Sequence, residues 1–323
     1  LKKSGRSAVL LSFVPASFEI IGYILCAPVI LGINRTEAAV MGAVLGAVSP
    51  AVVVPRMVNL IEKKYGTDKA IPQMILAGAS CDDIFVIVLF TTFLSMAQGG
   101  SAHVMDFVNI PISIVLGVLL GVDVGYGLYL FFETSYARKH CVRNSMKVII
   151  VLGFSFLLIA IEGWLEGKVS VSGLLAVVAM ACVLKLKCPE SVSGRLSQKF
   201  GKLWLAAEVI LFVLVGAAVD IRYTLAAGLP ALIMIFVALA FRTVGVLICV
   251  AYTSLTWKER LFCVIAYLPK ATVQAAIGSV PLAAGLACGN IVLSVAVLAI
   301  VVTAPLGAIG IDGTYKHLLS EDK

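Results

Sequence analysis

Long apolar stretches separated by short polar ones make up almost all of this 323-residue chain. Each stretch is close to the roughly 20 residues that a helix needs to cross the hydrocarbon core of a bilayer. Most charged residues lie in the short segments between the stretches. The pattern predicts ten membrane-spanning helices, at residues 8–33, 38–58, 71–97, 108–132, 145–163, 169–187, 201–220, 226–254, 259–284 and 290–311.

The composition points to the same class of protein. Hydrophobic residues make up 61% of the chain and charged residues 13%, and the mean hydropathy is +1.06. A soluble domain is about 45–50% apolar and about 25% charged. We therefore expect an all-α polytopic membrane protein. The chain opens on LKKSGRSA, without Met or a visible signal peptide, so we expect it to be the middle of a longer protein.

The net charge of +7 is explained by membrane topology. Of the 25 Lys and Arg residues, 23 lie in the loops or at the ends of the predicted helices, and 20 of these fall on one side when the loops alternate. Basic loops are cytoplasmic by the positive-inside rule. Both ends of the chain are therefore expected in the cytoplasm, with the helices in the inner or plasma membrane if the source is a bacterium. The basic excess can contact anionic lipid, and nucleic-acid binding is disfavoured.

The cysteine and histidine residues are scattered, without a CxxC or Cys/His cluster. Isolated cysteines in apolar surroundings are typical of structural, unreactive positions. The spacing therefore predicts neither a zinc site nor a disulfide framework. We expect no cofactor and no enzymatic activity.

An acidic pair lies inside one of the apolar stretches. Asp82 and Asp83 are adjacent within the predicted helix 71–97. A charged side chain at the bilayer centre costs about 2.5–3.5 kcal/mol even on lenient insertion scales, so such residues usually have partners or a function. Adjacent side chains on a helix diverge by about 100°. One carboxylate can therefore face a transport site while the other faces a neighbouring helix, and the pair indicates an ion or proton pathway.

Two predicted helices carry prolines at mid-membrane depth. Pro50 and Pro55 lie in helix 38–58, and Pro269 lies in helix 259–284 beside polar Thr272 and Gln274. Proline removes a backbone hydrogen bond, and the freed carbonyls must be satisfied by protein, water or an ion. A pair of interrupted helices in corresponding positions is the best sequence indication of a transporter site. We therefore expect both helices to be broken.

The first three and the last three predicted helices resemble each other in order. Each trio has a charged helix, then a proline-broken helix, then a third, and the trios begin on opposite sides of the membrane. This pattern is typical of inverted-repeat transporters. Glu19 and Arg242, in the first helix of each trio, could form a buried ion pair. A passive channel is less favoured, because the helices offer one charged cluster rather than a continuous polar pore.

Four stretches, GAVSPAVVVPRM, GASCDDI, FRTVGV and YLPKATVQAAIGSVPL, resemble monovalent cation/proton antiporters of the sodium/proton exchanger superfamily, in its NHA-like branch. The resemblance covers essentially the whole chain, and LPKATVQAAIGS is its most specific part. It implies the inverted-repeat antiporter fold with two broken, crossing helices, about three further helices before this chain, and a homodimer.

The resemblance also implies roles for the acidic pair and for the first break. Asp83 matches the carboxylate that binds the ion, either Na⁺ (or Li⁺) or a proton, and Asp82 is its neighbour. Ser49-Pro50 stands where other members often carry Thr-Asp, which removes one acidic residue from this site. Ser49 is the remaining oxygen ligand expected there.

Three further residues are expected to compensate charge. Arg242 matches a position that is Lys in some members of the family, and Glu19 matches the acid expected to pair with it. Lys270 lies in the second broken helix. Arginine stays protonated in proteins, whereas a buried lysine can release its proton. Which of Asp82 and Glu19 pairs with Arg242 is left open by the sequence.

The expected activity is exchange of Na⁺ (or Li⁺) for H⁺ by an alternating-access, elevator-like mechanism, with a role in pH homeostasis. A K⁺/H⁺ exchanger, an organic-anion symporter of related architecture, and a non-transporting sensor or assembly subunit are the alternatives. The expected parts are a first half of the ion-carrying core at 1–97, a linker helix at 98–135, dimerisation helices at 136–224, a second core half at 225–311 and a cytoplasmic tail at 312–323.

Overall fold

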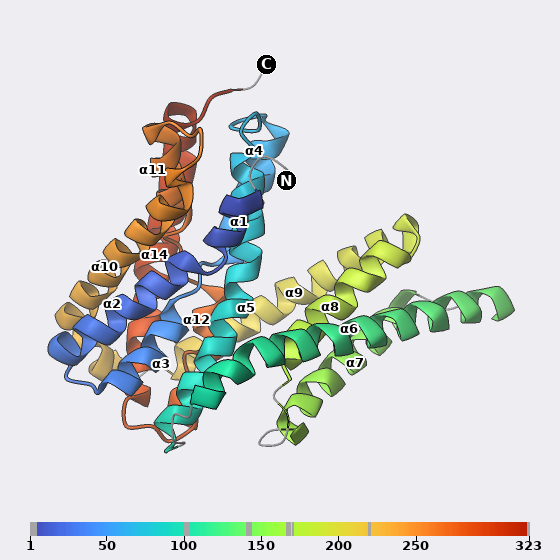
Figure 1. Ribbon diagram of the computed structural model, residues 1–323, viewed down its shortest axis with the longest axis horizontal. Helices are drawn as coiled ribbons and strands as arrows, with labels where there is room; N and C mark the ends of the chain where they lie inside the picture. The colour runs from blue at the N-terminus through green and yellow to red at the C-terminus, as the bar shows by residue number, and fades with distance from the viewer. Residues whose placement is uncertain are drawn as a thin grey trace. The chain divides into compact units, whose positions relative to one another are not determined.

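The computed structural model describes residues 5–99, 104–139, 144–165, 169, 171–218 and 221–321. The described chain is helical throughout, apart from turns and one isolated bridge between Tyr65 and Glu321. It divides into two compact units, which are described separately (Figure 1). Unit 1 combines Leu1–Ser101 with Leu211–Lys323, and unit 2 is Ala102–Ile210.

The helices follow the predicted apolar stretches closely. In the first part of unit 1 they are α1 (Gly5–Leu11), α2 (Val14–Leu31), α3 (Arg35–Leu45), α4 (Pro50–Glu62) and α5 (Ile71–Ala97). In its second part they are α10 (Ile221–Ala251), α11 (Trp257–Ala266), α12 (Thr272–Ile277), α13 (Val280–Ala283) and α14 (Gly289–Leu318). Unit 2 contains α6 (Val104–Lys139), α7 (Asn144–Leu165), α8 (Gly173–Lys187) and most of α9 (Glu190–Ala218).

Length and hydropathy qualify six helical segments of the described chain as candidate membrane spans. One of them, Arg35–Glu62, joins α3 and α4 across a non-helical segment. Shorter apolar helices at Phe85–Ala97 and Thr272–Ala283 add to these six. The prediction of an all-α membrane protein is therefore confirmed.

The two helices predicted at 38–58 and 259–284 are both broken, as expected. The first is interrupted between Leu45 and Pro50, and the second between Ala266 and Thr272. Pro50 occupies the first position of α4, where a helix has no intrahelical partner for a backbone N–H. The second break contains Pro269.

The expectation that Pro55 also helps to break the first helix is wrong. Pro55 lies inside α4, which continues through it to Glu62. A proline within a helix forfeits only the bond to the carbonyl four residues earlier, and membrane helices tolerate this where nearby groups satisfy the turn. The carbonyl freed by Pro55 is that of Ala51, and the Arg56 guanidinium donates to the neighbouring Val52 carbonyl at 2.9 Å.

Helices α2 and α10 pack side by side in unit 1 (Figure 1). Gly245 of α10 permits this, since a Cβ there would lie 2.9 Å from Pro15 Cα of α2. Small residues allow such close approach between membrane helices. The surrounding core includes Tyr23, Met41 and Ile235, all buried. This packing brings Glu19 of α2 and Arg242 of α10 into contact.

Unit 2 has its own core. Helix α8 packs against α6 and α7, and buried Phe132, Leu158 and Met180 lie at their contacts. Side chains on the outer faces of α7 and α9 are exposed and apolar, as with Phe156 and Leu205. In a membrane protein such faces meet lipid or a second subunit.

Candidate ion-binding site

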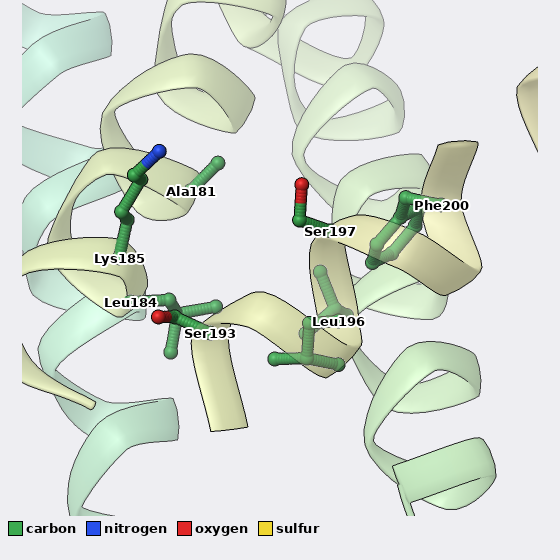
Figure 2. A pocket seen from close by; sticks show the side chains of 8 residues that line it. Ala181, Leu184, Lys185, Ser193, Leu196, Ser197 and Phe200 are labelled. Carbon is green, nitrogen blue, oxygen red and sulfur yellow. The ribbon is translucent and has the colours of Figure 1, made fainter. Parts of the chain in front are cut away.

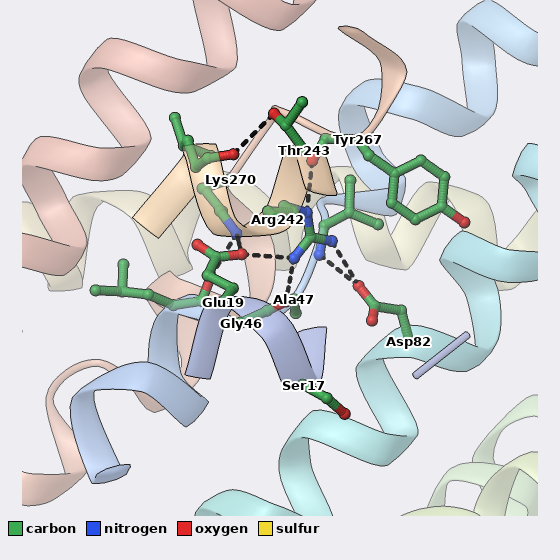
Figure 3. A network of polar contacts seen from close by, with 12 residues as sticks. Ser17, Glu19, Gly46, Ala47, Asp82, Arg242, Thr243, Tyr267 and Lys270 are labelled. Carbon is green, nitrogen blue, oxygen red and sulfur yellow. Dashed lines mark hydrogen bonds and ion pairs between the residues drawn. The ribbon is translucent and has the colours of Figure 1, made fainter. Parts of the chain in front are cut away.

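Arg242 of α10 is the centre of a buried polar network in unit 1 (Figure 3). Its Nη1 donates to Glu19 Oε2 at 2.6 Å, and its Nη2 donates to Asp82 Oδ2 at 3.0 Å. The same guanidinium donates from Nε to the Tyr267 carbonyl at 2.8 Å and from Nη1 to the Gly46 carbonyl at 2.5 Å. The question left open by the sequence is answered, because Arg242 pairs with both acids.

Lys270 extends the network from the second break. Its Nζ donates to Glu19 Oε2 at 2.6 Å and to the Leu45 carbonyl at 2.5 Å. Its backbone N–H donates to Thr303 Oγ1 of α14 at 2.9 Å. Lys270 is therefore held at both its backbone and its side chain. Its ammonium lies at the carboxyl end of α3, where it contacts Glu19 of α2.

The two breaks cross and touch each other. The Ser49 N–H in the first break donates to the Pro269 carbonyl in the second at 2.8 Å. Gly307 of α14 makes room for this crossing, since a Cβ there would lie 2.2 Å from Pro269 Cγ. The two unwound segments therefore satisfy part of each other's backbone, as non-helical backbone at membrane depth requires.

Side chains satisfy two further backbone groups of the first break. The Val48 N–H donates to Asp82 Oδ2 at 2.8 Å, and Gln274 Nε2 of α12 donates to the Ala47 carbonyl at 2.9 Å. Hydrogen bonds from backbone N–H groups and a guanidinium both favour a charged carboxylate. Asp82 is therefore held in place from two sides.

The four network side chains are almost completely buried, and their formal charges balance. Glu19, Arg242 and Lys270 are 1% exposed and Asp82 is 0% exposed. Two negative and two positive charges leave the cluster neutral. Burial of charges is tolerated only when they are paired and hydrogen-bonded in this way, and removal of one partner typically costs about 3–5 kcal/mol.

Asp83 is adjacent to this cluster in sequence but takes no part in its ion pairs. Within the described residues its Oδ1 is buried and has no hydrogen-bond partner, while the side chain as a whole is partly exposed. Among the other buried oxygens without a partner in the part of the chain that the structure describes are Ser49 Oγ, Asp82 Oδ1 and Gln274 Oε1. All four are acceptors that a cation or proton could engage.

The structure thus brings together most of the site residues predicted from sequence. Buried Thr272 begins α12 beside the second break, and Pro55 lies within α4 away from the first break. Sequence reasoning missed Thr303 and the carbonyl of Tyr267. Thr303 is an isolated polar residue in an apolar helix, a signal that could have been used, whereas a backbone carbonyl has no sequence signature.

A separate cavity in unit 2 does not compete for this role (Figure 2). Its volume is about 190 Å³, and its lining includes Leu184, Lys185, Ser193 and Phe200. Among the described residues of this lining Lys185 is the one ionisable group, and it is basic, so these residues offer no carboxylate to a cation. Across the described residues, no cluster of three His, Cys, Asp or Glu side chains could hold a metal ion.

The sequence matches the family described as "Sodium/hydrogen exchanger, transmembrane" over residues 1–315. The chain belongs to this family. Sodium/hydrogen exchanger 9B2 from Homo sapiens is 33% identical over 320 residues, which cover 96% of this chain and 58% of that exchanger. Sodium/hydrogen exchanger 9B1 from Homo sapiens is 30% identical over 285 residues, covering 84% of this chain and 53% of that one. The chain spans somewhat more than half the length of these exchangers.

A solved structure places this exchanger chain in a known fold. The sodium proton antiporter MjNhaP1 from Methanocaldococcus jannaschii superposes with a TM-score of 0.80 at 17% sequence identity, covering 98% of this chain and 80% of that one. At this identity the likeness concerns the fold. The antiporter fold expected from the sequence resemblance is therefore confirmed.

Proposed function

We propose that the protein exchanges Na⁺ (or Li⁺) for H⁺ across the membrane and that Asp83 is the carboxylate that binds either one. One observation carries the proposal: Asp83 is left out of the ion pairs that balance its four charged neighbours. When ionised, it adds one uncompensated negative charge at membrane depth. A single monovalent cation or a single proton neutralises that charge, so the two compete for the same group.

The same balance of charges bears on the stoichiometry. Arg242 stays protonated in proteins. Lys270 is tied to Glu19 and to the Leu45 carbonyl, and we take it to keep its proton through the cycle. Asp83, outside the four paired charges, is then the group that changes its occupant. We expect one cation to move for each proton, with no net charge transferred.

The unpartnered oxygens of Asp82 and Ser49 suit an alkali cation. Hard cations take oxygen ligands from carboxylates, hydroxyls and carbonyls. Asp82 Oδ1 and Ser49 Oγ are two such oxygens, and neither has another partner among the described residues. Asp82 is expected to assist while remaining paired with Arg242, and Ser49 is expected to contribute its hydroxyl.

The division of the chain into two units supports an elevator-like mechanism. Unit 1 contains both broken helices and the complete charged cluster. A body of this kind can move with its bound ion while a second body stays fixed in the membrane. We assign that fixed role, together with homodimerisation, to helices within residues 136–224, and the linker role to the helix predicted at 98–135.

Contacts within unit 1 support the predicted topology. Tyr65 Oη donates to Glu321 at 2.9 Å, the Gly66 N–H donates to the Ser320 carbonyl at 2.8 Å, and Lys69 Nζ donates to Glu259 at 2.8 Å. These contacts join three segments that the positive-inside rule assigns to the cytoplasm. The terminal residues 1–4 and 322–323 lie outside the described residues.

The test uses the full-length protein in proteoliposomes with an imposed pH gradient and a trapped pH-sensitive dye. Na⁺, Li⁺ and K⁺ are added in turn to the unmodified protein, to Asp83→Asn and to Asp312→Asn. Asp312 is an exposed acid on α14 and serves as the matched control. We expect Na⁺ and Li⁺ to dissipate the gradient in the unmodified protein and in the control, and Asp83→Asn to abolish the response while remaining folded.

Full activity of Asp83→Asn would remove the carrier assignment. A response to K⁺ alone would keep the exchange but change its substrate. A folded protein without a response to any of the three cations would favour a sensor or assembly subunit of the same fold.

A further inference from the structure

We propose that Tyr267 is a positioning residue for the exchange, and that its hydroxyl is the hydrogen-bond donor for Asp82 Oδ1. The proposal rests on the exchange function proposed above, in which Asp82 assists Asp83. It gives a role to a phenol of the second break that the ion pairs around Arg242 leave unused.

The position of the Tyr267 side chain is fixed by its surroundings. Tyr267 is the C-cap residue of α11, where the second break begins. Its N–H donates to the Val264 carbonyl at 3.1 Å, and its own carbonyl accepts from Arg242 Nε at 2.8 Å. The ring is completely buried, and the guanidinium carbon of Arg242 lies 5.6 Å from the ring centroid. The phenol is therefore held by the same arginine that pairs with Asp82.

The hydroxyl of Tyr267 contacts α5 at Gly78. A Cβ at Gly78 would lie 2.2 Å from Tyr267 Oη, which is closer than two such atoms can approach. Glycine is therefore the residue that leaves room for the hydroxyl at this point.

Gly78 stands four residues before Asp82, so this contact brings the phenol to the turn that precedes the carboxylate. Residues at this spacing share one face of a helix, with Cβ atoms about 5–6 Å apart. Side chains on a helix also lean toward its N-terminus, which is the direction of Gly78. In Figure 3 the phenol and Asp82 lie on the same side of Arg242, and the two groups are close enough to interact electrostatically.

The two groups are complementary. Tyr267 Oη and Asp82 Oδ1 are both buried, and neither has a hydrogen-bond partner among the described residues. The phenol has a proton to donate, whereas an ionised carboxylate only accepts. Asp82 Oδ2 already accepts from the Val48 N–H and from Arg242 Nη2. A buried polar atom without a partner costs free energy, and one connection between Oη and Oδ1 removes that cost for both.

The geometry favours a connection through one water molecule. Two consecutive O–H···O hydrogen bonds span about 5.5 Å, which suits groups on adjacent helical turns that do not bond directly. The Ala8 carbonyl lies 3.5 Å from the same Cβ position at Gly78 and offers a third contact. A buried water typically makes about three hydrogen bonds to polar groups of this kind.

A donor at Oδ1 has a consequence for the exchange. Hydrogen bonds to the charged form of a carboxylate favour that form. With Arg242 and the Val48 N–H on one oxygen and Tyr267 on the other, Asp82 stays ionised while Asp83 exchanges its proton for a cation. The phenol thereby keeps the two adjacent carboxylates from competing for the same proton.

The rival explanation is that the phenol only fills the core beside Arg242. The ring alone does this, so Tyr267→Phe, which keeps the ring and removes the hydroxyl, separates the two. Removal of an unpartnered buried hydroxyl leaves the melting temperature unchanged or raises it. Removal of a donor to a carboxylate lowers the melting temperature and lets Asp82 take up a proton more readily.

Two variants test the contact from opposite sides. Tyr267→Phe removes the hydroxyl, and Gly78→Ala keeps it but places a methyl group where it lies. Both should change exchange in the same direction, and Gly78→Ala should add little in the Tyr267→Phe background, because the two residues act through one contact. Tyr65→Phe is the matched control, since its hydroxyl donates to Glu321 in an exposed contact.

The readouts are exchange by the full-length protein in proteoliposomes, as a function of Na⁺ concentration and of pH, and the melting temperature of the purified protein. For Tyr267→Phe we expect the half-maximal Na⁺ concentration to rise about threefold to tenfold at an unchanged maximal rate. The pH of half-maximal exchange should shift upward by about 0.5–1 unit, because Asp82 then needs a higher pH to lose its proton. The melting temperature should fall. Tyr65→Phe should match the unmodified protein in exchange.

A Na⁺ dependence and a pH profile of Tyr267→Phe identical to those of the unmodified protein would overturn the proposal, whatever the melting temperature. A lower maximal rate alone would likewise leave Tyr267 a structural role only. If Tyr267→Phe does not fold, replacement of Tyr267 by 3-fluorotyrosine decides. That phenol is a stronger donor of nearly the same size, so the pH profile should shift downward, and an unshifted profile would exclude the bond.

The melting temperature separates failure of this proposal from failure of the proposed function. If the unmodified protein shows no exchange with any cation, the proposed function fails, while a lower melting temperature of Tyr267→Phe would still support the bond to Asp82. If exchange is present and Tyr267→Phe changes neither exchange nor melting temperature, the assignment of Tyr267 fails alone.

Discussion

Unit 1 contains two sets of ion pairs in very different surroundings. Around Arg242 the partners are 1% exposed or less, and each carboxylate meets more than one donor. At the ends of the helices, Arg56 and Asp312 form a pair with side chains 28% and 60% exposed. Both sets join helices far apart in sequence, and both include a guanidinium paired with a carboxylate.

The difference lies in what each pair would lose if one partner were removed. Near the surface, water replaces the missing partner, so exposed pairs contribute about 0–1 kcal/mol. In the buried cluster the remaining charge is left in a medium that cannot solvate it. The buried set also supplies donors to the Leu45, Gly46 and Tyr267 carbonyls. Its charges therefore hold the broken helices in place, which exposed pairs cannot do.

The largest expected effect is that of Arg242→Met. Loss of the guanidinium leaves Glu19 with Lys270 as its only cation and leaves Asp82 without a cationic partner in the cluster. We expect the free energy of unfolding to fall by about 3–5 kcal/mol, the range found when one partner of a buried pair is removed. The measurement is denaturant or thermal unfolding of the purified full-length protein in detergent.

Arg56→Met is the matched control for this comparison. It removes the same kind of side chain from an exposed pair, where we expect a loss of about 1 kcal/mol or less. If the two variants unfold at similar denaturant concentrations, the buried cluster does not carry the stability that its geometry indicates, and the contrast between the two regions is lost.

A smaller effect is expected for Lys270→Met. Glu19 keeps its bond to Arg242 in this variant, so the loss is that of the charged hydrogen bonds from Nζ to Glu19 and Leu45. Hydrogen bonds to charged groups are worth about 1.5–3 kcal/mol. We expect a destabilisation in this range. Because one positive charge is gone, the loaded and the protonated forms both acquire a net charge, so the rate of exchange should become sensitive to membrane potential although one cation still moves for each proton. Membrane-potential dependence of exchange in proteoliposomes measures the second effect.

An exchange rate for Lys270→Met that stays independent of membrane potential would contradict the proposed charge balance. The variant would then show that Lys270 is structural only. Unaltered stability would instead contradict the network geometry around Glu19.

Much of this fold could be predicted from the sequence because hydrophobic length and proline position are local signals. Helix α5 was predicted at 71–97 and has these bounds. The two breaks were predicted from Pro50 and Pro269, and each lies where expected. Pro55 misled because a proline can also lie within a continuous helix, and only the surroundings of its turn decide between the two.

The candidate site was less accessible from sequence. Glu19, Arg242 and Lys270 were identifiable as charges in apolar stretches. That Arg242 and Lys270 both donate to the same Glu19 oxygen was not, because these two residues lie 223 and 251 positions after Glu19 and meet it only through the packing of their helices. The division of labour between Asp82 and Asp83 follows from which of them faces Val48 and Arg242. A pair of adjacent, identical residues contains no information about that choice.

Ser49→Ala should separate stability from ion binding within the buried region. Ser49 is the N-cap residue of α4, but its side chain makes no capping hydrogen bond. Loss of a working cap costs about 0.5–2 kcal/mol. We therefore expect almost no change in the free energy of unfolding, and a rise of about threefold to tenfold in the Na⁺ concentration for half-maximal exchange if the hydroxyl is a ligand. Destabilisation without a change in this concentration would assign the hydroxyl a structural role.

The smallest effect is expected at the exposed end of unit 1, in Asp312→Asn. The Asp312 side chain is 60% exposed, and its pair with Arg56 has a distance of 3.1 Å. Such a pair contributes about 0–1 kcal/mol and is screened by salt. We expect a small loss of stability in low salt that disappears in high salt, whereas the losses in Arg242→Met and Lys270→Met should persist. Unfolding of all three variants at two ionic strengths is the measurement. A salt-sensitive loss in Arg242→Met would mean that water reaches the cluster, and the contrast between the two regions would then fail.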